Sequence, residues 1–403
     1  MLKGKHIVLG VTGSIAAYKI ANLASMLGKQ HAKVTVLMTK NATNFINPIT
    51  FETLTGNKCL VDTFDRNFQY SVEHVAIAKS ADVVLVAPAS ANVIGKLANG
   101  IADDMLTTTI MACECPKIVA PAMNTQMYRN PVVQDNMEKL RHYGMCVITP
   151  DSGHLACGDT GIGKMPSEEV LKEYLLREVA FEKDMKGMKV LVTAGPTQER
   201  IDPVRYISNH STGKMGYAIA RNAMQRGAEV VLVTGKTAIA PPPFTEVVPV
   251  ISAADMASEV KKYADSCDII IKSAAVADYR PADPAEEKVK KKEGELQIRL
   301  ERTEDILAYL GNHRREGQFI CGFSMETEHM IENSRAKLEK KKIDMIVANN
   351  LKQKGAGFGT DTNIVTFITA EEEVEKPLLS KEEVARELLD YILKNRQSEK
   401  KTR

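Results

Sequence analysis

The chain has 403 residues, of which 44% are hydrophobic and 26% charged, and its formal net charge is only +2. That length exceeds one ordinary hydrophobic core and predicts two domains of roughly 200 residues each. The near-neutral charge gives no electrostatic argument for nucleic acid, and no apolar run reaches the length of a membrane span. The first apolar run is broken by Gly10, Thr12 and Gly13, unlike a signal peptide, and seven scattered cysteines favour reduced thiols. We therefore expect a cytoplasmic protein.

One sequence pattern begins twice, at residues 7–14 and again at residues 189–197. Each time a continuous apolar strand ends in a turn of small residues, and a helical pattern, a glycine and a second β-branched strand follow. Third strands follow at 82–86 and 268–271. Strands alternating with helical patterns are typical of βαβ units. We predict an α/β protein with two Rossmann-like domains in tandem, each a mostly parallel sheet with helices on both faces. The predicted domains are 1–188 and 189–403.

The first turn closes a strand and starts a helix at Gly13 and Ser14. Such a turn presents free backbone N–H groups at the positive end of a helix, which suits a phosphate, although a simple tight turn is the alternative. The second strand ends at Thr39 and Lys40, where dinucleotide-binding folds place an acidic residue. This favours a mononucleotide phosphate over NAD.

Small and amide side chains follow two later strands of the first half. Ser90, Ala91 and Asn92 come after one strand, and Asn124 comes after another. Open α/β sheets bind ligands at the carboxyl ends of their strands. These residues predict a flat slot for a planar ring, with ordinary turns as the alternative.

Two further residues are candidates for chemistry. His74 lies early on a predicted helix, where a structural histidine is the commoner interpretation. Cys157 lies in the glycine-rich segment 153–165, which predicts a flap rather than a core element. A thiol there has little packing value and is available to react.

Taken together, the motifs of the first half resemble the flavin-dependent cysteine decarboxylase family. They are the G-S-I-A-A-Y opening, His74, P-A-S-A-N, P-A-M-N-x-x-M and A-C-G-x-x-G-x-G, with Tyr128 where the family usually has tryptophan. The resemblance implies FMN, whose oxidation of the substrate thiol provides the electron sink that decarboxylation needs. It implies that His74 is the catalytic base, that Asn124 binds the substrate carboxylate and that Cys157 donates a proton. The implied FMN contacts are Gly13, Ser14 and Thr39 for the phosphate, and Ser90, Ala91 and Asn92 for the ring.

The second half contains a loop dense in anion-binding side chains. Arg205, Asn209, Ser211, Thr212 and Lys214 precede a helix that starts near residue 217. The P-loop pattern G-x-x-x-x-G-K-[ST] is absent, but an anion at this helix N-terminus is favoured over a purely structural loop. A mixed charge run at 286–294 predicts either a solvated loop or one that closes over a triphosphate.

Three motifs of this half resemble phosphopantothenate–cysteine ligases: S-N-H-S-T-G-K-M-G, A-A-V-A-D-Y and K-V-K-K. With the first half, the match covers about residues 4–390. The chain thus resembles the bacterial bifunctional coenzyme A biosynthesis family, in which a phosphopantothenoylcysteine decarboxylase is fused to the ligase. The resemblance implies that CTP with Mg²⁺ activates 4′-phosphopantothenate as an acyl-cytidylate, which the amine of cysteine then attacks.

The resemblance also assigns residues of the ligase site. Asp278 contacts the cytidine and Lys288 the reacting triphosphate, while Arg205, Asn209 and Ala274 contact phosphopantothenate or the acyl intermediate. Asn209 and Lys288 are expected to be catalytic, and no metal ligand is assigned. The remaining CTP contacts are Glu304, where the family usually has proline, and Asp305, Ile306, Leu307, Phe323, Lys337 and Lys341.

Two other functions share the first fold. One is a non-catalytic flavin-binding regulator that pairs with a phosphatase, and the other is a flavin-dependent prenyltransferase. The ligase half and the presence of His74, Asn124 and Cys157 argue against both. The resemblance further implies a homo-oligomer with trimers of the flavin domain and dimers of the ligase domain, which a dodecamer would combine. Its expected partners are small-molecule substrates, with neither nucleic acid nor a membrane.

Overall fold

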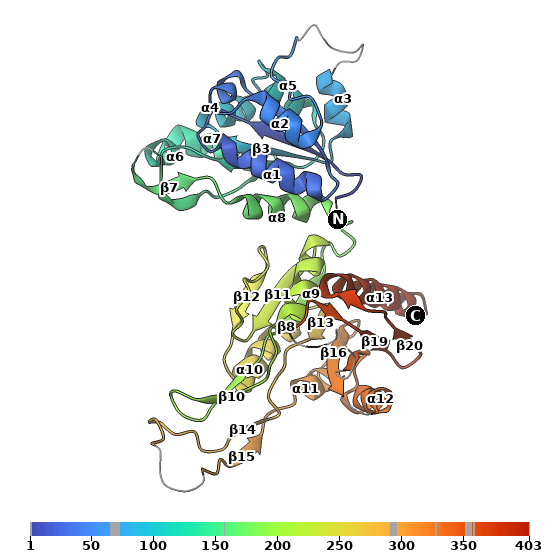
Figure 1. The fold of residues 1–403 in the computed structure, drawn as a ribbon. Helices are drawn as coiled ribbons and strands as arrows, with labels where there is room; N and C mark the ends of the chain where they lie inside the picture. Colours follow the sequence, from blue (N-terminus) through green and yellow to red (C-terminus); the bar gives the residue numbers. More distant parts are fainter. Residues whose placement is uncertain are drawn as a thin grey trace. The chain divides into compact units, whose positions relative to one another are not determined.

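The computed structural model describes residues 2–64, 73–156, 158–290, 296–326, 329–350, 357 and 359–402. The chain forms two compact units, Met1–Glu182 and Lys183–Arg403 (Figure 1). Each unit contains its own main sheet, and most strands of both sheets are parallel. The predicted fold class is therefore confirmed. Within the described residues, no helix has the length and apolar character needed to cross a membrane.

The first unit contains a five-stranded parallel sheet with the order β2-β1-β3-β4-β5. Its strands are β1 (His6–Val11), β2 (Lys33–Met38), β3 (Val83–Ala89), β4 (Lys117–Pro121) and β5 (Cys146–Val147), and β6 (Asp151–His154) pairs with β7 (Thr160–Lys164) in an antiparallel hairpin. Its helices are α1 (Ala17–Lys29), α2 (Pro48–Thr55), α3 (Glu73–Ser80), α4 (Ala91–Ala98), α5 (Met105–Ala112), α6 (Thr125–Arg129), α7 (Pro131–His142) and α8 (Glu168–Val179), with a 3-10 helix at Lys40–Asn44.

Alternate side chains of this sheet enter two different cores. On β1, Ile7 and Leu9 pack in the core that α1 and α8 cover, whereas Val8 packs in the core of α4, α5 and α7 (Figure 1). This alternation is what the period of two residues in a strand requires. Because the five strands are parallel, the loops after β1, β3 and β4 meet at one edge of the sheet.

The second unit contains an eight-stranded sheet with the order β12-β11-β8-β13-β16-β17-β19-β20, in which the last two strands are antiparallel to their neighbours. The strands are β8 (Lys189–Ala194), β11 (Glu229–Thr234), β12 (Glu246–Pro249), β13 (Ile269–Lys272), β16 (Phe319–Glu326), β17 (Met345–Asn350), β19 (Val365–Ile368) and β20 (Glu373–Glu375). The helices are α9 (Lys214–Gln225), α10 (Ala253–Ala264), α11 (Ile306–Asn312), α12 (Met330–Lys341) and α13 (Lys381–Thr402).

Helices cover both faces of this sheet as well. Helices α9 and α13 share one core with alternate residues of β8, and α10, α11 and α12 share the other (Figure 1). Three two-stranded antiparallel sheets lie outside the main sheet of this unit within the described residues. They are β9 (Gln198–Arg200) with β10 (Tyr206–Ser208), β14 (Tyr279–Pro281) with β15 (Leu300–Arg302), and β18 (Thr362–Asn363) with β21 (Leu379–Ser380).

Both sheets fix the start of two neighbouring strands with an aspartate. The Asp82 backbone N–H donates to the His6 carbonyl at 2.9 Å, and the Asp82 carboxylate accepts from the His6 N–H at 2.7 Å. Asp268 makes the same pair of contacts with Lys189, at 2.8 and 2.9 Å. Each aspartate therefore sets the register of its own strand against the first strand of its unit.

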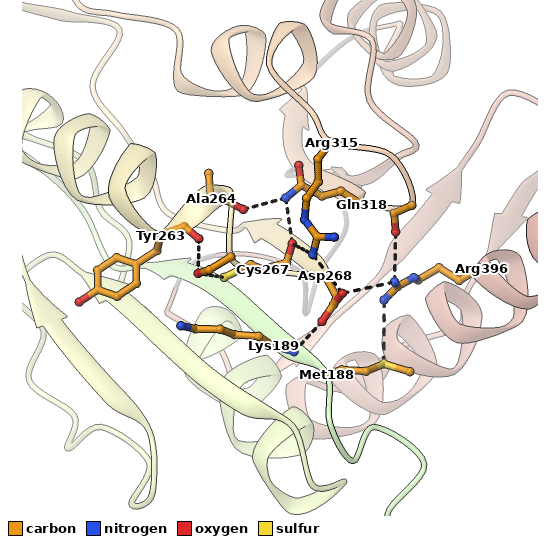
Figure 2. Close-up of polar contacts among 11 residues, drawn as sticks. Met188, Lys189, Tyr263, Ala264, Cys267, Asp268, Arg315, Gln318 and Arg396 are labelled. Carbon is orange, nitrogen blue, oxygen red and sulfur yellow. Dashed lines mark hydrogen bonds and ion pairs between the residues drawn. The ribbon is translucent and has the colours of Figure 1, made fainter.

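Arginines surround the second of these aspartates (Figure 2). The Asp268 carboxylate accepts a hydrogen bond from Arg315 at 3.1 Å, and Arg396 of α13 lies 3.9 Å away. Burial tends to raise the pKa of Asp268, but the Lys189 N–H and the two guanidinium groups outweigh burial and hold that pKa below its usual range. The carboxylate therefore stays ionised at the base of the sheet.

Candidate active sites

The first candidate site lies where the direction of the first sheet reverses. The chain goes from β1 to β2 on one side and later to β3 on the other. The loops after β1 and β3 therefore lead to helices on opposite faces of the sheet, and a crevice lies between them. Open α/β sheets bind ligands in such a crevice. Thr12, which is fully buried, donates to the Pro88 carbonyl at 2.6 Å and accepts from the Ser90 N–H at 2.9 Å. This hydroxyl holds the two loops together.

Helix α1 begins at this crevice without a side-chain cap. Its N-cap residue is Ala16, and no acidic side chain occupies the first turn. Gly13 allows close packing there, because a Cβ at this position would lie 2.9 Å from the Cβ of Asn41. The Ala17 and Lys19 N–H groups of this turn donate to the Ser14 and Ala16 carbonyls, at 3.0 and 3.1 Å. The positive end of the helix dipole still favours an anion at this point.

The β6–β7 hairpin packs against the loop after β4. The Gly163 carbonyl accepts from the Met123 N–H at 3.1 Å, and a Cβ at Gly163 would lie only 2.2 Å from the Met123 carbonyl oxygen. The Asn124 amide donates to the Asp159 carboxylate at 2.9 Å. The hairpin is thus a flap that lies directly over Asn124.

A cavity of about 470 Å³ occupies the space between these loops. Small and apolar side chains provide much of its lining, together with the cationic side chains Lys19 and Lys164. Neither lysine was singled out from the sequence, although Lys19 follows the G-S-I-A-A-Y motif directly. The predicted residues that line the cavity are Gly13, Ser14, Ser90, Ala91 and Asn124.

Other predicted residues of this half lie elsewhere. Thr39 is buried and caps the 3-10 helix by accepting from the Ala42 N–H, and Asn92 is exposed on α4. His74 is half-buried on α3. None of these three lines the cavity. Cys157 lies outside the described residues.

The second sheet repeats the arrangement of the first at its own reversal between β8 and β13. The hydroxyl of Thr193, a buried residue of β8, accepts from the Ala274 N–H at 3.1 Å. The hydroxyl of Thr197 accepts from the Ala277 N–H at 3.0 Å. These contacts hold the A-A-V-A-D-Y segment against the turn after β8.

Helix α9 also begins at a crevice without a side-chain cap. Gly213 is its N-cap residue, with φ of 78°, and no acidic residue lies in the first turn. At Gly216 a Cβ would lie 2.6 Å from the Cβ of Ala194, so glycine lets the helix approach β8. The Ser211–Gly216 segment lines the adjoining cavity, and the positive end of the helix dipole favours an anion there.

Two cavities of about 390 and 450 Å³ adjoin this crevice. The two cavities share part of their walls, because both are lined by Lys272, Val276, Asp278 and Lys341. Seven residues that the resemblance assigns to the ligase site line the larger one: Asn209, Ala274, Asp278, Leu307, Phe323, Lys337 and Lys341. The predicted anion-binding residues Ser211, Thr212 and Lys214 line it as well. Glu304, Asp305 and Ile306 line the smaller one.

Charged partners position several of these side chains. Lys341 pairs with Asp305 at 3.2 Å, and Lys337 donates to the Ser324 hydroxyl at 3.1 Å. The Glu304 carboxylate pairs with Lys261 of α10, with one oxygen at 2.6 Å. The Asn209 amide donates to the Ala275 carbonyl at 3.1 Å.

Arg205 and Lys288 line neither cavity. The Arg205 guanidinium donates to the buried Asp202 carboxylate, at 2.6 Å for Nη2, and to the Val289 carbonyl at 2.9 Å. Asp202 also accepts from the Val289 N–H at 3.2 Å. Hydrogen bonding from Arg205 and then from backbone N–H groups holds the pKa of Asp202 far below its usual range. This pair therefore anchors the backbone beside Lys288, which is exposed.

Among the polar residues of the larger cavity that sequence reasoning did not assign to a site, Asn349, Lys381 and Lys272 are the most informative. Asn349, at the end of β17, is 4% exposed, and its Oδ1 has no hydrogen-bond partner within the described residues. Lys381 begins α13 and is 6% exposed. Lys272 ends β13, and burial, followed by the charge of Lys341, lowers its pKa to about 8. A polar residue at the end of an otherwise apolar strand was the available signal for Lys272 and Asn349.

Comparisons with known proteins agree with both halves. The Flavoprotein family model matches residues 1–180, and the model of the DNA/pantothenate metabolism flavoprotein C-terminal domain matches residues 185–395. The coenzyme A biosynthesis bifunctional protein CoaBC of Bacillus subtilis (strain 168) is 45% identical over 396 residues, which cover 97% of each chain.

Solved structures resemble each half separately. A crystal structure of the C-terminal domain of a coenzyme A biosynthesis bifunctional protein CoaBC is 45% identical and covers 52% of this chain and 95% of its own, with a TM-score of 0.45. A crystal structure of the FMN-dependent cysteine decarboxylase SpaF is 33% identical and covers 40% of this chain and 90% of its own, with a TM-score of 0.36.

The fold, the paired cavities and the two family models define a two-domain flavoprotein of pantothenate metabolism. The chain belongs to the family of bifunctional coenzyme A biosynthesis proteins, CoaBC. It is a phosphopantothenate–cysteine ligase and a phosphopantothenoylcysteine decarboxylase in one polypeptide. The regulator and prenyltransferase alternatives therefore do not apply.

Proposed function

We propose that the first cavity binds FMN and that decarboxylation takes place there. The residues present fit the group: the uncapped start of α1, beside Gly13 and Ser14, suits the phosphate, and Lys19 adds a positive charge. Ser90, Ala91 and the apolar wall of the cavity suit a planar ring. When bound, FMN would take two electrons from the cysteinyl thiol carbon, which provides the electron sink for loss of CO₂, and would return them afterwards.

The side chains around the cavity would handle the substrate. The Asn124 amide would bind the substrate carboxylate, and its hydrogen bond to Asp159 supports this role because a carboxylate already accepts from it. Substrate binding would exchange one carboxylate for the other and move the flap. We further propose that Cys157, which falls between β6 and β7 in the sequence, donates the final proton. Three further residues that do not line the cavity are kept in this proposal. His74 would be the catalytic base, Thr39 would contact the FMN phosphate and Asn92 would contact the ring.

We propose that the two cavities of the second unit bind CTP and the phosphopantothenoyl group. The lysines of α12 and the start of α9 offer positive charge to a triphosphate, and Asp278 offers an acceptor to a ribose hydroxyl. Attack of the phosphopantothenate carboxylate on the α-phosphorus of CTP would release diphosphate and form the acyl-cytidylate. The neutral amine of cysteine would then attack the acyl carbon and displace CMP to form the amide. The nucleotide contacts proposed are Asp278, Glu304, Asp305, Ile306, Leu307, Phe323, Lys337 and Lys341.

Magnesium would enter this site with the nucleotide. Mg²⁺ in nucleotide sites is commonly held by one or two carboxylates together with substrate phosphates. The described residues contain no group of three or more His, Cys, Asp or Glu side chains that could hold a metal. A site of this kind needs no such group, because the triphosphate supplies the oxygen ligands.

Asn209 and Lys288 would act on the reacting groups of the ligase. Asn209 already points its amide toward the Ala275 carbonyl at the cavity, where the acyl group would lie with Ala274. Lys288 would reach the triphosphate as its segment closes, with the Asp202–Arg205 pair as the anchor. Arg205 would then contact phosphopantothenate through its remaining donors.

A homo-oligomer would complete both sites. Val204, Tyr206 and Tyr279 on the hairpins of the second unit are each about half exposed, as are Ile15 and Tyr18 beside the first cavity. Exposed apolar side chains gathered at binding loops are typical of protein interfaces. We propose that the hairpin residues pair two ligase units and that the α1 residues contribute to a trimer of flavin units.

The presence of a cavity at each sheet reversal carries this proposal. The test uses the full chain with FMN, 4′-phosphopantothenate, cysteine, Mg²⁺ and either CTP or ATP, with products followed by mass spectrometry. Phosphopantetheine formed with CTP, through phosphopantothenoylcysteine, is the expected result. Equal yield with ATP would refute the CTP assignment, and activity without bound FMN would refute the flavin assignment.

Two matched substitutions separate the sites. Asn124→Asp places a second negative charge beside the substrate carboxylate, so decarboxylation should fall at least about a hundredfold while ligation remains. Asn209→Asp removes the amide donor and adds charge near the phosphates, so ligation should fall equally while decarboxylation of supplied phosphopantothenoylcysteine remains. Each variant is the control for the other, and loss of both activities in one variant would contradict the assignment.

A further inference from the structure

Lys272 lies where the two cavities of the second unit meet. It is the last residue of β13, in register with Thr193 of β8 on one side and Gly322 of β16 on the other. The three residues before it, Ile269–Ile271, are fully buried. The strand therefore carries its one charged side chain to the ligand edge at the middle of the sheet, where it lines both cavities.

The neighbouring lysines have partners. Lys341 pairs with Asp305 at 3.2 Å, Lys337 donates to Ser324 at 3.1 Å, and Lys214 pairs with Asp361 at 2.6 Å. Lys272 is also half-buried, yet no described residue accepts a hydrogen bond from its side chain or forms an ion pair with it. A partly buried ammonium without an acceptor loses hydration that an anion would replace.

We propose that the Lys272 ammonium binds the phosphate chain of the nucleotide co-substrate, at the junction of the two cavities. This rests on the proposed use of CTP and adds a residue to that site. Phosphate oxygens could also come from 4′-phosphopantothenate. The nucleotide is favoured because Lys272 lines both cavities together with Lys341 and Asp278, which are proposed nucleotide contacts. A triphosphate also carries more negative charge than a phosphomonoester, so a cluster of lysines binds it more strongly.

Proton uptake should accompany this binding. In the free protein, burial and then Lys341 lower the pKa of Lys272 to about 8, against the opposing charges of Asp305 and Asp278. A bound phosphate chain raises that pKa, because it stabilises the charged amine. Above pH 8 the amine must therefore gain a proton as the nucleotide binds, and affinity falls by up to about tenfold per pH unit until the pKa of the bound form is reached. Below pH 8 the amine is already charged and contributes no pH dependence.

Other charged groups line the same cavities, and a change of pH acts on them as well as on Lys272. The effect of Lys272 is therefore obtained by comparing the unaltered protein with each Lys272 variant at the same pH. The charged groups that line the two cavities around Lys272 are Lys337 and Lys341 of α12, Asp278 after β13, Arg302 of β15, Glu304 and Asp305 before α11, and Lys214 and Lys381.

Isothermal titration calorimetry of the full chain with Mg·CTP tests the proposal. Titrations at pH 7.0 and pH 9.0, in buffers of different ionisation enthalpy, report both affinity and protons taken up. The unaltered protein should take up protons at pH 9.0. Lys272→Met should lose that uptake and bind CTP about ten- to a hundredfold more weakly at pH 7.0, the size of one charge-assisted hydrogen bond. Lys272→Arg, which cannot titrate, should keep affinity within about threefold and show no uptake from this site.

Controls separate this inference from the proposed function. Lys262→Met removes an exposed lysine of α10 that pairs with Glu259 and should change neither measurement. An unchanged circular dichroism spectrum and thermal unfolding curve show that the altered second unit is folded, and retained decarboxylation shows that the first unit is intact. Unchanged affinity and proton uptake in Lys272→Met would overturn the inference while CTP binding stands. Weaker binding of 4′-phosphopantothenate but not of CTP would also overturn it. An unaltered protein that binds no CTP would overturn the nucleotide assignment and this inference together.

Discussion

The two units place their cavities at the same point of the topology and line them differently. In each, a buried threonine beside the first strand accepts an N–H from the loop across the sheet reversal: Thr12 from Ser90, and Thr193 from Ala274. In each, an uncapped helix begins at the crevice. The first cavity is then closed by the β6–β7 flap and is largely apolar, whereas the second pair of cavities is lined by lysines and aspartates.

This difference separates what the topology determines from what the side chains determine. The reversal of strand order creates the crevice, and the shared threonine contact keeps its two loops together in both units. The lining then selects the ligand, because an apolar slot suits a planar ring and a cluster of lysines suits a polyphosphate. A change to the flap should therefore affect decarboxylation and leave ligation unchanged. A change to Thr12 or Thr193 should loosen the two loops that this threonine joins in its own unit.

The largest expected effect is on the rate of decarboxylation, when a substitution displaces the flap. Gly163 has a φ of 136°, and a Cβ there would lie 2.2 Å from the Met123 carbonyl oxygen. Gly163→Ala should therefore displace β7 from the loop that carries Asn124. Because a displacement of about 1 Å at a reacting group can cost about a hundredfold in rate, decarboxylation of phosphopantothenoylcysteine should fall by at least that factor. Steady-state rates of both reactions are the measurement, and ligation should be unchanged.

Gly153→Ala is the matched control on the paired strand. A Cβ at Gly153 would meet only the Lys164 side chain, at 3.6 Å, which is ordinary contact. Decarboxylation in this variant should stay within about twofold of the unaltered protein. A fully active Gly163→Ala protein would show that the flap does not position Asn124.

The contrast between the units also explains what sequence reasoning reached. The apolar strands that begin each half, and the small-residue turns after them, predicted both sheets, because fully buried parallel strands are continuous in apolar residues. Strand β16 was not predicted: Phe319–Glu326 carries Cys321, Gly322 and Ser324, which weaken an apolar pattern although the strand lies in the middle of the sheet.

The sites were predicted unevenly for a related reason. Ser90 was proposed because it follows a strand, a position that indicates a site, and Asn209 was proposed because its loop is dense in anion-binding side chains. Lys272 was missed because it ends a strand and resembles an ordinary boundary residue. The hydrogen bonds from Arg205 to Asp202 and Val289 join segments more than 80 residues apart, and no local pattern predicts such a contact.

A middle-sized effect tests whether the two threonine contacts are equivalent. Thr12→Val and Thr193→Val keep side-chain volume but leave a partly buried N–H, of Ser90 or Ala274, without its acceptor. Each should destabilise its own crevice by about 1 to 3 kcal/mol. Hydrogen exchange with mass spectrometry should show faster exchange in peptides that contain Ser90 for the first variant and Ala274 for the second.

Serine restores the hydroxyl at both positions, so Thr12→Ser and Thr193→Ser should recover most of the protection. The Thr12 variant should suffer more, because that hydroxyl also donates to the Pro88 carbonyl and so loses two contacts. Equal loss in both variants would mean that the second contact of Thr12 contributes little. Spread of the effect into the other unit would contradict the separation of the two scaffolds.

The smallest effect concerns the aspartates at the opposite edge of the sheets. Asp268→Asn keeps an acceptor for the Lys189 N–H but removes the charge that Arg315 and Arg396 face (Figure 2). The side chain is 29% exposed, so solvent screens the pair and the expected loss in stability of the second unit is about 1 kcal/mol at pH 7. Hydrogen exchange of peptides from β8 and β13 measures it.

The pH dependence of that loss has a definite sign. The pKa of Asp268 is held below its unfolded value, so the carboxylate contributes stability that is present above an unfolded pKa of about 3.9 and disappears as the pH falls through the folded pKa. The difference between the unaltered protein and Asp268→Asn should therefore be constant from pH 7 to about pH 5 and shrink below about pH 4. Asp82→Asn is the comparison in the first unit, because the Asp82 carboxylate accepts from the His6 N–H and pairs with no arginine among the described residues. A larger loss of stability for Asp82→Asn than for Asp268→Asn would mean that the arginines around Asp268 add no stability. The hydrogen bond from the backbone N–H to the aspartate would then be the contact that fixes this edge in each sheet.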